Sequence, residues 1–347
     1  MILVTGGAGY VGSVLVNELL SLGESVRVVD TLWFDNPFSA GNRRLEVIQA
    51  DVRYTDRAWL DGVTAVVHLA GLSNDPTADF APDLNAQSNV LATRELGEAV
   101  ADVATREQRE IRFLLASTCS VYYSPVSEGD MNVQQMVEDL PIAPTANYSK
   151  TKRLAEIELL RLAERHRFFC PVILRKGTIF GRSPRMRFDL VVNTFTLHAW
   201  RNRMLIVHGH GEMWRPLLHV RDAADAYIHL LWAPTGLIRG DTFNVVHKNY
   251  RVLELAHWVS ETLNQHRKVD IGVKRDRSGT PGSRSYYVVG DRIGRVLGLR
   301  PERGTADAIL EIWDGLERGE FGPSPDANPK YFNIRHLQAT LPKAAFA

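Results

Sequence analysis

The chain has 347 residues, of which 45% are hydrophobic and 23% are charged, as is usual for a globular protein of one large or two joined domains. Its 41 Lys and Arg residues nearly balance its 40 Asp and Glu residues, which argues against a protein that binds nucleic acid or a membrane surface. No apolar run approaches the roughly 18 residues that a membrane-spanning helix needs. Two Cys residues without metal-ligand spacing predict neither a disulfide framework nor a metal site, and we expect a cytoplasmic protein without a signal peptide.

Short β-branched apolar runs alternate with helical patterns through the first half of the chain. The expected strands are Ile2–Val4, Val26–Val29, Leu45–Ile48, Ala65–Leu69, Arg112–Ala116 and Val172–Leu174. The helices expected between them are Val11–Leu22, Leu84–Ala104 and Tyr148–Arg165. This alternation predicts an α/β fold with a doubly wound parallel sheet of the Rossmann type.

The composition of the sequence changes after about residue 175, where Pro, Gly, Arg and Trp become frequent. Helices are expected at Asp222–Trp232 and Val252–Leu263, and a strand at Thr242–Val246. We predict a nucleotide-binding Rossmann domain at 1–175 and a smaller mixed α/β substrate-binding domain at 176–347. Segments near 215–247 are candidates to return to the first domain. The Pro-rich tail from Phe321 to Ala347 is expected to wrap the surface.

A glycine-rich turn lies between the first predicted strand and the first predicted helix. It has the spacing G-x-x-G-x-x-G, provided by Gly6, Gly9 and Gly12. Glycine lets the backbone approach a pyrophosphate closely, and the following helix offers free N–H groups and its positive end to the anion. The turn therefore predicts a bound dinucleotide. The expected cofactor contacts here are Gly6, Gly9, Tyr10, Val11, Gly12 and Asp30.

Asp30 indicates which dinucleotide is bound. It closes the second predicted strand, at the place where a carboxylate hydrogen-bonds the adenosine ribose and repels a 2′-phosphate. This favours NAD over NADP. NADP stays open as an alternative because Arg43 or Arg44 could reach a phosphate.

Tyr148 and Lys152 have the spacing Tyr-x-x-x-Lys at the start of a predicted helix. Residues four apart share a helix face, so we expect the Lys152 ammonium beside the Tyr148 hydroxyl. A free tyrosine titrates near ~10. The ammonium, a positive nicotinamide and the helix N-terminus would all favour the phenolate. We therefore predict that Tyr148 is a base at neutral pH and that Thr118 donates a hydrogen bond to the same substrate oxygen.

These motifs resemble the extended short-chain dehydrogenase/reductase family, and in particular its NAD-dependent nucleotide-sugar epimerases and dehydratases. Further matching segments are His68–Gly71, Ser117–Tyr122, Leu174–Gly181 and Trp214–Asp222. The resemblance implies NAD as the cofactor and a nucleotide-diphosphate sugar as the substrate. It also implies that Thr118 and Tyr148 carry proton transfer, and that Lys152 orients Tyr148 and binds the nicotinamide ribose.

The resemblance assigns further binding residues. The other cofactor contacts that it implies are Asp51 and Val52, near the adenine, and Leu69, Ala70 and Gly71. The substrate contacts that it implies are Ser73, Asn74, Thr118, Thr178, Arg187, Arg215 and Arg284. Arg215 matches the family arginine that pairs with the nucleotide diphosphate, an anion that suits a guanidinium fork. Arg277 is the alternative to Arg284 as a second arginine, and Arg185 and Arg187 either face the substrate or lie on the surface.

The two positions after Thr118, occupied here by Cys119 and Ser120, differ between family members that catalyse different reactions. Dehydratases carry Asp-Glu there, because loss of water needs an acid and a base, and decarboxylases usually have Glu at the position of Ser120. Reductases need no such pair but commonly prefer NADPH, which Asp30 disfavours. We therefore predict a C4-type epimerase, which removes a hydride to give a transient keto sugar and returns it to the other face. A reductase or a dehydratase is the alternative.

A 3,5-type epimerase is a further alternative, because some of these enzymes use a cysteine acid/base on this loop. Their cysteine matches Ser120, so Cys119 is one residue away. On an extended segment that offset reverses the direction of the side chain, and we expect Cys119 to be a packed residue. Lys176 and Thr178 depart from the family pattern near the sugar, which predicts an uncommon sugar.

The resemblance also bears on partners. The helices Leu84–Ala104 and Tyr148–Arg165 often form a dimer interface in relatives, so we expect a homodimer. The alternative from a different class is a dinucleotide sensor without catalytic activity. Such sensors typically lack one residue of the Tyr-Lys pair, and this chain has both. We expect no metal, because the His residues lack ligand spacing.

Overall fold

Parallel strands form the centre of the structure, a computed structural model that describes residues 1–122, 134–278 and 285–340. Within these residues, seven strands form one sheet in the order β11-β7-β5-β4-β1-β2-β3, and all neighbouring strands are parallel. Their bounds are β1 (Ile2–Thr5), β2 (Val26–Asp30), β3 (Leu45–Gln49), β4 (Ala65–His68), β5 (Ile111–Thr118), β7 (Phe169–Lys176) and β11 (Thr242–Val245). The predicted doubly wound sheet is confirmed.

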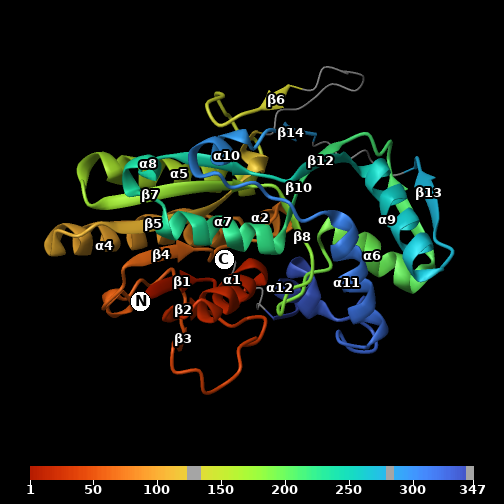
Figure 1. Cartoon of the computed structure of the whole chain (residues 1–347), viewed down its shortest axis with the longest axis horizontal. Helices are drawn as coiled ribbons and strands as arrows, with labels where there is room; N and C mark the ends of the chain where they lie inside the picture. The colour runs from red at the N-terminus through yellow and green to blue at the C-terminus, as the bar shows by residue number, and fades with distance from the viewer. Residues whose placement is uncertain (123–133, 279–284, 341–347) are drawn as a thin grey trace.

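Helices cover both faces of this sheet (Figure 1). One face carries α1 (Tyr10–Ser21) and α7 (Val220–Trp232), and the other carries α4 (Ala92–Glu107) and α5 (Asn147–Arg165). Successive side chains of β1 enter opposite cores, because Ile2 and Val4 pack on the α1 side and Leu3 on the α4 side. A strand buried on both faces has no polar alternation, which explains the continuous apolar runs in the sequence.

The single helix predicted at Leu84–Ala104 is interrupted. The structure has α3 (Pro82–Ala86), then one π turn (Gln87–Leu91), and then α4. Asn89 in this π turn is fully buried, and its Nδ2 donates to the carbonyl oxygen of Leu72 at 3.0 Å. A π turn inserts one residue into a helix and is frequent at functional sites. The prediction missed it because hydrophobic periodicity does not resolve a single inserted residue.

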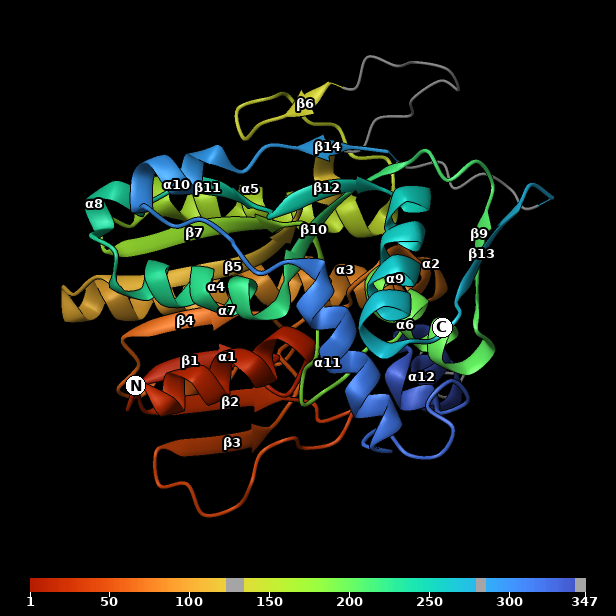
Figure 2. The same cartoon turned by 45° about the vertical axis from the view of Figure 1, so that its right-hand side comes forward.

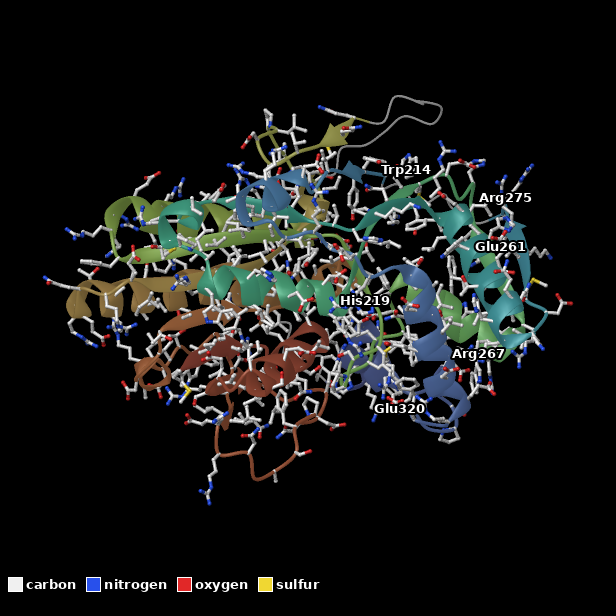
Figure 3. All side chains as sticks on the ribbon, in the orientation of Figure 1. Trp214, His219, Glu261, Arg267, Arg275 and Glu320 are labelled. Carbon is white, nitrogen blue, oxygen red and sulfur yellow. The ribbon has the colours of Figure 1, made fainter. Side chains whose placement is uncertain are left out.

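The later part of the chain builds smaller sheets around a second core. Its strands are β8 (Thr178–Phe180), β10 (Trp214–His219) and β12 (Lys248–Arg251) in one sheet, and β9 (Met204–His208) paired with β13 (Gly272–Asp276). A further strand, β14 (Tyr287–Val288), pairs with β6 (Gln135–Met136) from the first half of the chain. The remaining helices are α2 (Asp75–Phe80), α6 (Val191–Asn202), α8 (Thr235–Ile238), α9 (Val252–Arg267), α10 (Asp291–Leu297), α11 (Thr305–Glu317) and α12 (Asn333–Thr340). Arg267 of α9 pairs with Asp314 of α11 at 2.7 Å, which ties these helices together (Figure 3).

The two parts of the chain interleave. β11 completes the large sheet beside β7, although β8 and β10 precede it in the sequence (Figure 2). In the same way α7, which comes from the later part of the chain, packs on α1. Among the described residues, no helix is both long enough and apolar enough to traverse a membrane.

The C-terminal tail is partly buried, whereas the sequence predicted a surface wrap. Phe321 and Tyr331 pack edge-on against Phe188, and all three side chains are buried. After this contact α12 follows, and Asn333 and Leu337 of this helix are buried too. The Pro residues of the tail suggested an irregular surface segment. Aromatic side chains of the same segment instead pack into the core and hold it there.

Candidate active site

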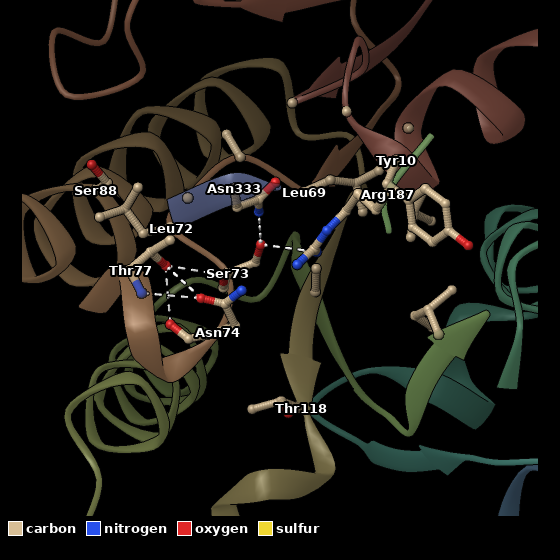
Figure 4. Close-up of a pocket in the computed structure, with 18 of the residues that line it drawn as sticks. Tyr10, Leu69, Leu72, Ser73, Asn74, Thr77, Ser88, Thr118, Arg187 and Asn333 are labelled. Atoms are coloured by element: carbon tan, nitrogen blue, oxygen red, sulfur yellow. Dashed lines mark hydrogen bonds between the residues drawn. The ribbon is translucent and has the colours of Figure 1, made fainter. Parts of the chain in front are cut away.

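A cleft of about 400 Å³ lies at the carboxyl ends of the central strands, where open parallel sheets bind their ligands. Figure 4 shows part of its wall. The predicted site residues that line it are Gly6, Gly9, Tyr10, Val11, Gly12, Asp30, Asp51, Val52, Leu69, Ala70, Gly71, Ser73, Asn74, Thr118, Tyr148, Lys152, Thr178 and Arg187. The fold thus brings together segments that are distant in the sequence. That these residues bind the cofactor or the substrate stays a prediction.

The glycine turn leaves no room for larger residues. Gly6 has a φ of +69°, and a Cβ added there would lie 2.6 Å from the backbone nitrogen of Ala70. A Cβ on Gly12 would lie 2.7 Å from the carbonyl oxygen of Gly7. Gly9 is the N-cap of α1 and provides no side-chain cap to the first turn of the helix. The turn therefore fits a pyrophosphate bound at the amino end of α1.

Asp30 supports the glycine turn as well as lining the cleft. Its Oδ2 accepts a hydrogen bond from the backbone nitrogen of Ala8 at 3.0 Å, and its Oδ1 accepts one from that of Leu32 at 2.9 Å. Burial raises the pKa of Asp30, and these two hydrogen bonds oppose the shift. A carboxylate has about four acceptor positions, so two stay available to a ribose diol. No local pattern in the sequence indicates the bond to Ala8.

Thr118, Tyr148 and Lys152 meet at one end of the cleft. The Thr118 hydroxyl lies near that of Tyr148 and lowers its pKa. Ser120 Oγ accepts hydrogen bonds from Thr118 at 3.0 Å and from Ser149 at 2.9 Å. Burial lowers the pKa of Lys152 to about 8, and the negative charge of Glu156 opposes that shift. The predicted catalytic residues are therefore in contact or close to one another.

The expectation that Tyr148 is a base at neutral pH stays a prediction, because it relies on the charge of the nicotinamide as well as on the protein. Burial raises the pKa of Tyr148 to about 12, and the neighbouring cation that lowers it is Arg187. Desolvation of the phenolate thus outweighs the charges of the protein itself. A further positive charge close to the hydroxyl is required, and an oxidised nicotinamide carries one.

Lys176 at the end of β7 lines the cleft, and its Nζ donates to the hydroxyl of Tyr227 at 2.9 Å. It lies opposite Thr118 in the register between β7 and β5. Burial is the main reason that its pKa falls to about 7, and the charge of Lys152 lowers it further. The sequence marked this residue only as unusual.

Replacing Lys176 with Met is expected to raise the melting temperature, most strongly below about pH 7. The folded pKa of Lys176 is about 7, below its ordinary value of 10.5. Between these values the unfolded chain binds more protons, so the wild type gains stability as the pH rises, and Lys176→Met lacks this titration. Thermal melts at about pH 6, 8 and 10 test this. Lys150→Met, at an exposed position, is the control, and a pH-independent difference would contradict the prediction.

Arg187 and Arg185 come from the loop between β8 and α6, and both are buried. The alternative that they lie on the surface is therefore wrong. Arg187 forms a two-bond ion pair with Asp189, at 2.8 and 2.9 Å, and donates to Ser73 Oγ at 3.2 Å. Asn333 of α12 also donates to Ser73 Oγ, at 2.9 Å (Figure 4). The cleft wall is thus a polar network of three distant segments.

Cys119 lies outside the cleft wall. It is 1% exposed, and its Sγ donates to the carbonyl oxygen of Arg175 at 3.1 Å. It packs in a small core with Tyr122 and Val288. Burial raises the pKa of its thiol well above the usual range, so a thiolate is disfavoured. This placement agrees with a packed residue.

Two arginines predicted to bind the substrate are not placed in the cleft. Arg215 on β10 is not among the residues that line it, and one of its terminal nitrogens donates to the carbonyl oxygen of Trp214 at 2.9 Å. Trp214, which is labelled in Figure 3, pairs with Arg251 at the end of β12. Arg284 lies outside the described residues, and its alternative, Arg277, is exposed. Within the described ranges, no group of three or more His, Cys, Asp or Glu side chains could hold a metal ion.

Residues 2–245 match the model of the "NAD dependent epimerase/dehydratase family". The chain is 30% identical over 242 residues to UDP-glucuronic acid decarboxylase 1 of Xenopus tropicalis, a match that covers 66% of this chain and 53% of the relative. It is 28% identical over 235 residues to a putative UDP-glucose 4-epimerase of Methanocaldococcus jannaschii, which covers 67% and 73%. The chain thus spans about half the length of the decarboxylase relative.

A similar fold occurs among solved structures. The UDP-glucuronic acid 4-epimerase of Bacillus cereus, in complex with UDP-glucuronic acid and NAD, superposes with a TM-score of 0.74. The match covers 91% of this chain and 99% of that one, at 23% sequence identity. At this identity the likeness establishes the fold, and the reaction has to be argued from the residues of the cleft.

Proposed function

Because the chain belongs to the NAD-dependent epimerase/dehydratase family, we propose that it epimerises a nucleotide-diphosphate sugar through a transient keto sugar. Membership of this family confirms the resemblance drawn from the sequence motifs, and it confirms NAD as the cofactor. The reaction that we propose is of the C4 type. A carbon-bound hydride leaves the sugar and returns to its opposite face, so no net oxidation occurs.

The cleft residues have separate tasks in this proposal. The glycine turn and Asp30 hold NAD, which supplies a hydride acceptor that can return the hydride. Tyr148 takes the proton of the sugar hydroxyl as the carbonyl forms, and gives it back when the carbonyl is reduced. The Thr118 hydroxyl lies near that of Tyr148 and so can contact the same sugar oxygen. The proton and the hydride both return to the sugar, which balances the reaction.

The surroundings of Ser120 support an epimerase best. Dehydratases and decarboxylases of this type need an additional acid or base after Thr118, and here Cys119 and Ser120 stand in those places. The Ser120 hydroxyl accepts hydrogen bonds from Thr118 and Ser149, and Cys119 is packed away from the cleft. An epimerase needs neither additional group.

The test is to incubate the purified protein with a panel of UDP-, dTDP-, GDP- and CDP-sugars and to identify the products by NMR. The expected result is an equilibrium mixture of two epimers of one sugar, with no net accumulation of reduced dinucleotide. Loss of water, release of CO₂ or stoichiometric reduction of NAD would contradict the proposal.

Decarboxylation is the second candidate, favoured by the 30% identity to a UDP-glucuronic acid decarboxylase. Lys176 would then have a place in binding a sugar carboxylate, because it lines the cleft near Thr118. UDP-glucuronic acid belongs in the same panel. Release of CO₂ from it would select this candidate, and formation of the 4-epimer with retention of the carboxylate would select the first.

Cys119→Ala is expected to leave kcat unchanged. The thiol is buried outside the cleft wall, and its loss should lower the free energy of unfolding by about 1 kcal/mol. Product formation in D₂O, followed by mass spectrometry, measures the incorporation of solvent deuterium into the sugar. Deuterium incorporation that disappears in this variant would favour a 3,5-type epimerase in which Cys119 takes part.

We also propose a homodimer that pairs through the face of α4 and α5. Leu154 on α5 is 49% exposed and Leu91, in the π turn beside it, is 41% exposed, although both are large apolar residues. Leu154→Glu is expected to shift the protein from dimer to monomer, because a charge in a symmetric interface occurs twice. Light scattering after size exclusion measures this. Leu237→Glu on α8 is the control, and an unchanged dimer in Leu154→Glu would contradict the proposal.

A further inference from the structure

Arg185 carries a buried charge that no carboxylate of the described residues contacts directly. The residue is 6% exposed, and its Nε has no hydrogen-bond partner among the residues that the structure describes. One terminal nitrogen donates to Oδ1 of Asn333 at 2.6 Å, and the guanidinium carbon lies 3.7 Å from the centroid of the Phe34 ring. Neither the neutral amide of Asn333 nor the aromatic ring of Phe34 carries a negative charge that would neutralise the guanidinium. Because an unpaired buried charge is costly, this position suits an anion.

Arg187, two residues further along the same loop, shows the contrast. Its fork is occupied by the carboxylate of Asp189, so it has little capacity for a second anion. Arg185 forms no such ion pair among the described residues and lines the cleft, and the carboxylates of Asp189 and Asp30 act on it only at longer range. Burial lowers the pKa of Arg185 to about 9, which still leaves it charged at neutral pH. The charge is therefore available to a ligand.

The position of Arg185 indicates which part of a ligand it would meet. The charge of Arg185 acts on Asp30 and on Tyr10, and its ring contact is with Phe34 in the segment after β2. Tyr10 begins α1 directly after the glycine turn. Arg185 therefore faces the half of the cleft that the glycine turn forms. It belongs to the loop between β8 and α6, which is distant from that turn in the sequence.

We propose that Arg185 binds the diphosphate of NAD from the side opposite the glycine turn, with Asn333 as the residue that positions it. The amino end of α1 and a guanidinium would then hold the diphosphate between them. The inference rests on NAD as the cofactor and is independent of the sugar reaction.

Asn333 connects this contact to the C-terminal helix. Its Nδ2 donates to Ser73 Oγ at 2.9 Å, and its backbone nitrogen donates to Oδ2 of Asp189 at 3.2 Å. α12 is thereby fixed to both walls of the cleft, beside Arg185. In our proposal this helix helps to retain the cofactor. Retention suits an enzyme that restores its cofactor in every turnover.

The test compares ligands with and without a diphosphate. Calorimetry with ADP-ribose, NAD, adenosine and 2′,5′-ADP is carried out on the wild type and on Arg185→Met. Arg185→Met removes a charge-assisted hydrogen bond, so its affinity for ADP-ribose and NAD should fall by about ten- to a hundredfold. Adenosine binding should be unchanged. Arg182→Met is the matched control, because Arg182 belongs to the same loop but is more exposed and pairs with Glu320 at 2.7 Å.

Three outcomes would overturn the proposal. Equal losses for ADP-ribose and adenosine would make Arg185 a structural residue, and unchanged affinities would exclude the contact. A larger loss for 2′,5′-ADP than for ADP-ribose would move the contact to a 2′-phosphate. If Arg185→Met does not fold, Arg185→Lys replaces it in the test, because lysine keeps the charge but lacks the guanidinium fork. This variant should bind ADP-ribose with intermediate affinity. Wild-type affinity in Arg185→Lys would show that the fork is not needed. Because binding is the readout, failure of the epimerase assay leaves this result interpretable.

Discussion

Tyr148→Phe is expected to lower kcat by about 10²- to 10⁴-fold while the protein still binds NAD. The substitution removes the hydroxyl that lies near Thr118 and that we propose as the proton acceptor. The ring that lines the cleft stays in place. Steady-state kinetics with the sugar identified by the panel, together with the NAD content of the purified variant, measure the two effects separately.

The control for this substitution is Tyr54→Phe, which removes a hydroxyl from a side chain that is 73% exposed. It should have the activity of the wild type. A Tyr148→Phe variant that keeps full kcat would show that proton transfer uses another group. If the wild type itself binds NAD but converts no sugar, and Tyr148→Phe preserves its cellular effect, the dinucleotide sensor becomes the better description.

The features that could be predicted from the sequence are those with short-range causes. The glycine turn needs three glycines within seven residues, and Gly6 and Gly12 face backbone atoms that exclude a Cβ. The parallel strands follow from runs of β-branched residues buried on both faces. Tyr148 and Lys152 share a helix face because of their spacing alone. Each of these is determined by a few neighbouring residues.

The features that could not be predicted depend on contacts between distant segments. Asn333 reaches Ser73 across 260 positions, and no local pattern indicates such a contact. The pKa of Tyr148 depends on how deeply the fold buries the hydroxyl, which the Tyr-x-x-x-Lys spacing does not report. Arg215 was assigned to the substrate by resemblance, and a motif match does not report which side chains line the cleft.

Arg175→Met is expected to lower the free energy of unfolding by about 3–5 kcal/mol, the usual effect of removing one partner of a buried ion pair. Arg175 on β7 donates to both carboxylate oxygens of Glu156 on α5, at 3.0 and 2.8 Å, and to the hydroxyl of Tyr122 at 2.7 Å. Glu156 is fully buried. The variant would leave this carboxylate with much less compensation and would lose a bond between strand and helix. Urea denaturation measures the effect.

Arg153→Met is the matched control, because Arg153 pairs with the same carboxylate at 2.9 Å but is 30% exposed. Its loss should cost less than about 1 kcal/mol, as is usual for exposed pairs. Similar values for the two variants would contradict the view that burial decides the effect.

The ion pair also bears on catalysis, since Glu156 lies one helical turn after Lys152 and opposes the fall in its pKa. Without Arg175, the less compensated carboxylate should raise the pKa of Lys152, and any pH dependence of kcat that reflects Lys152 should move to higher pH.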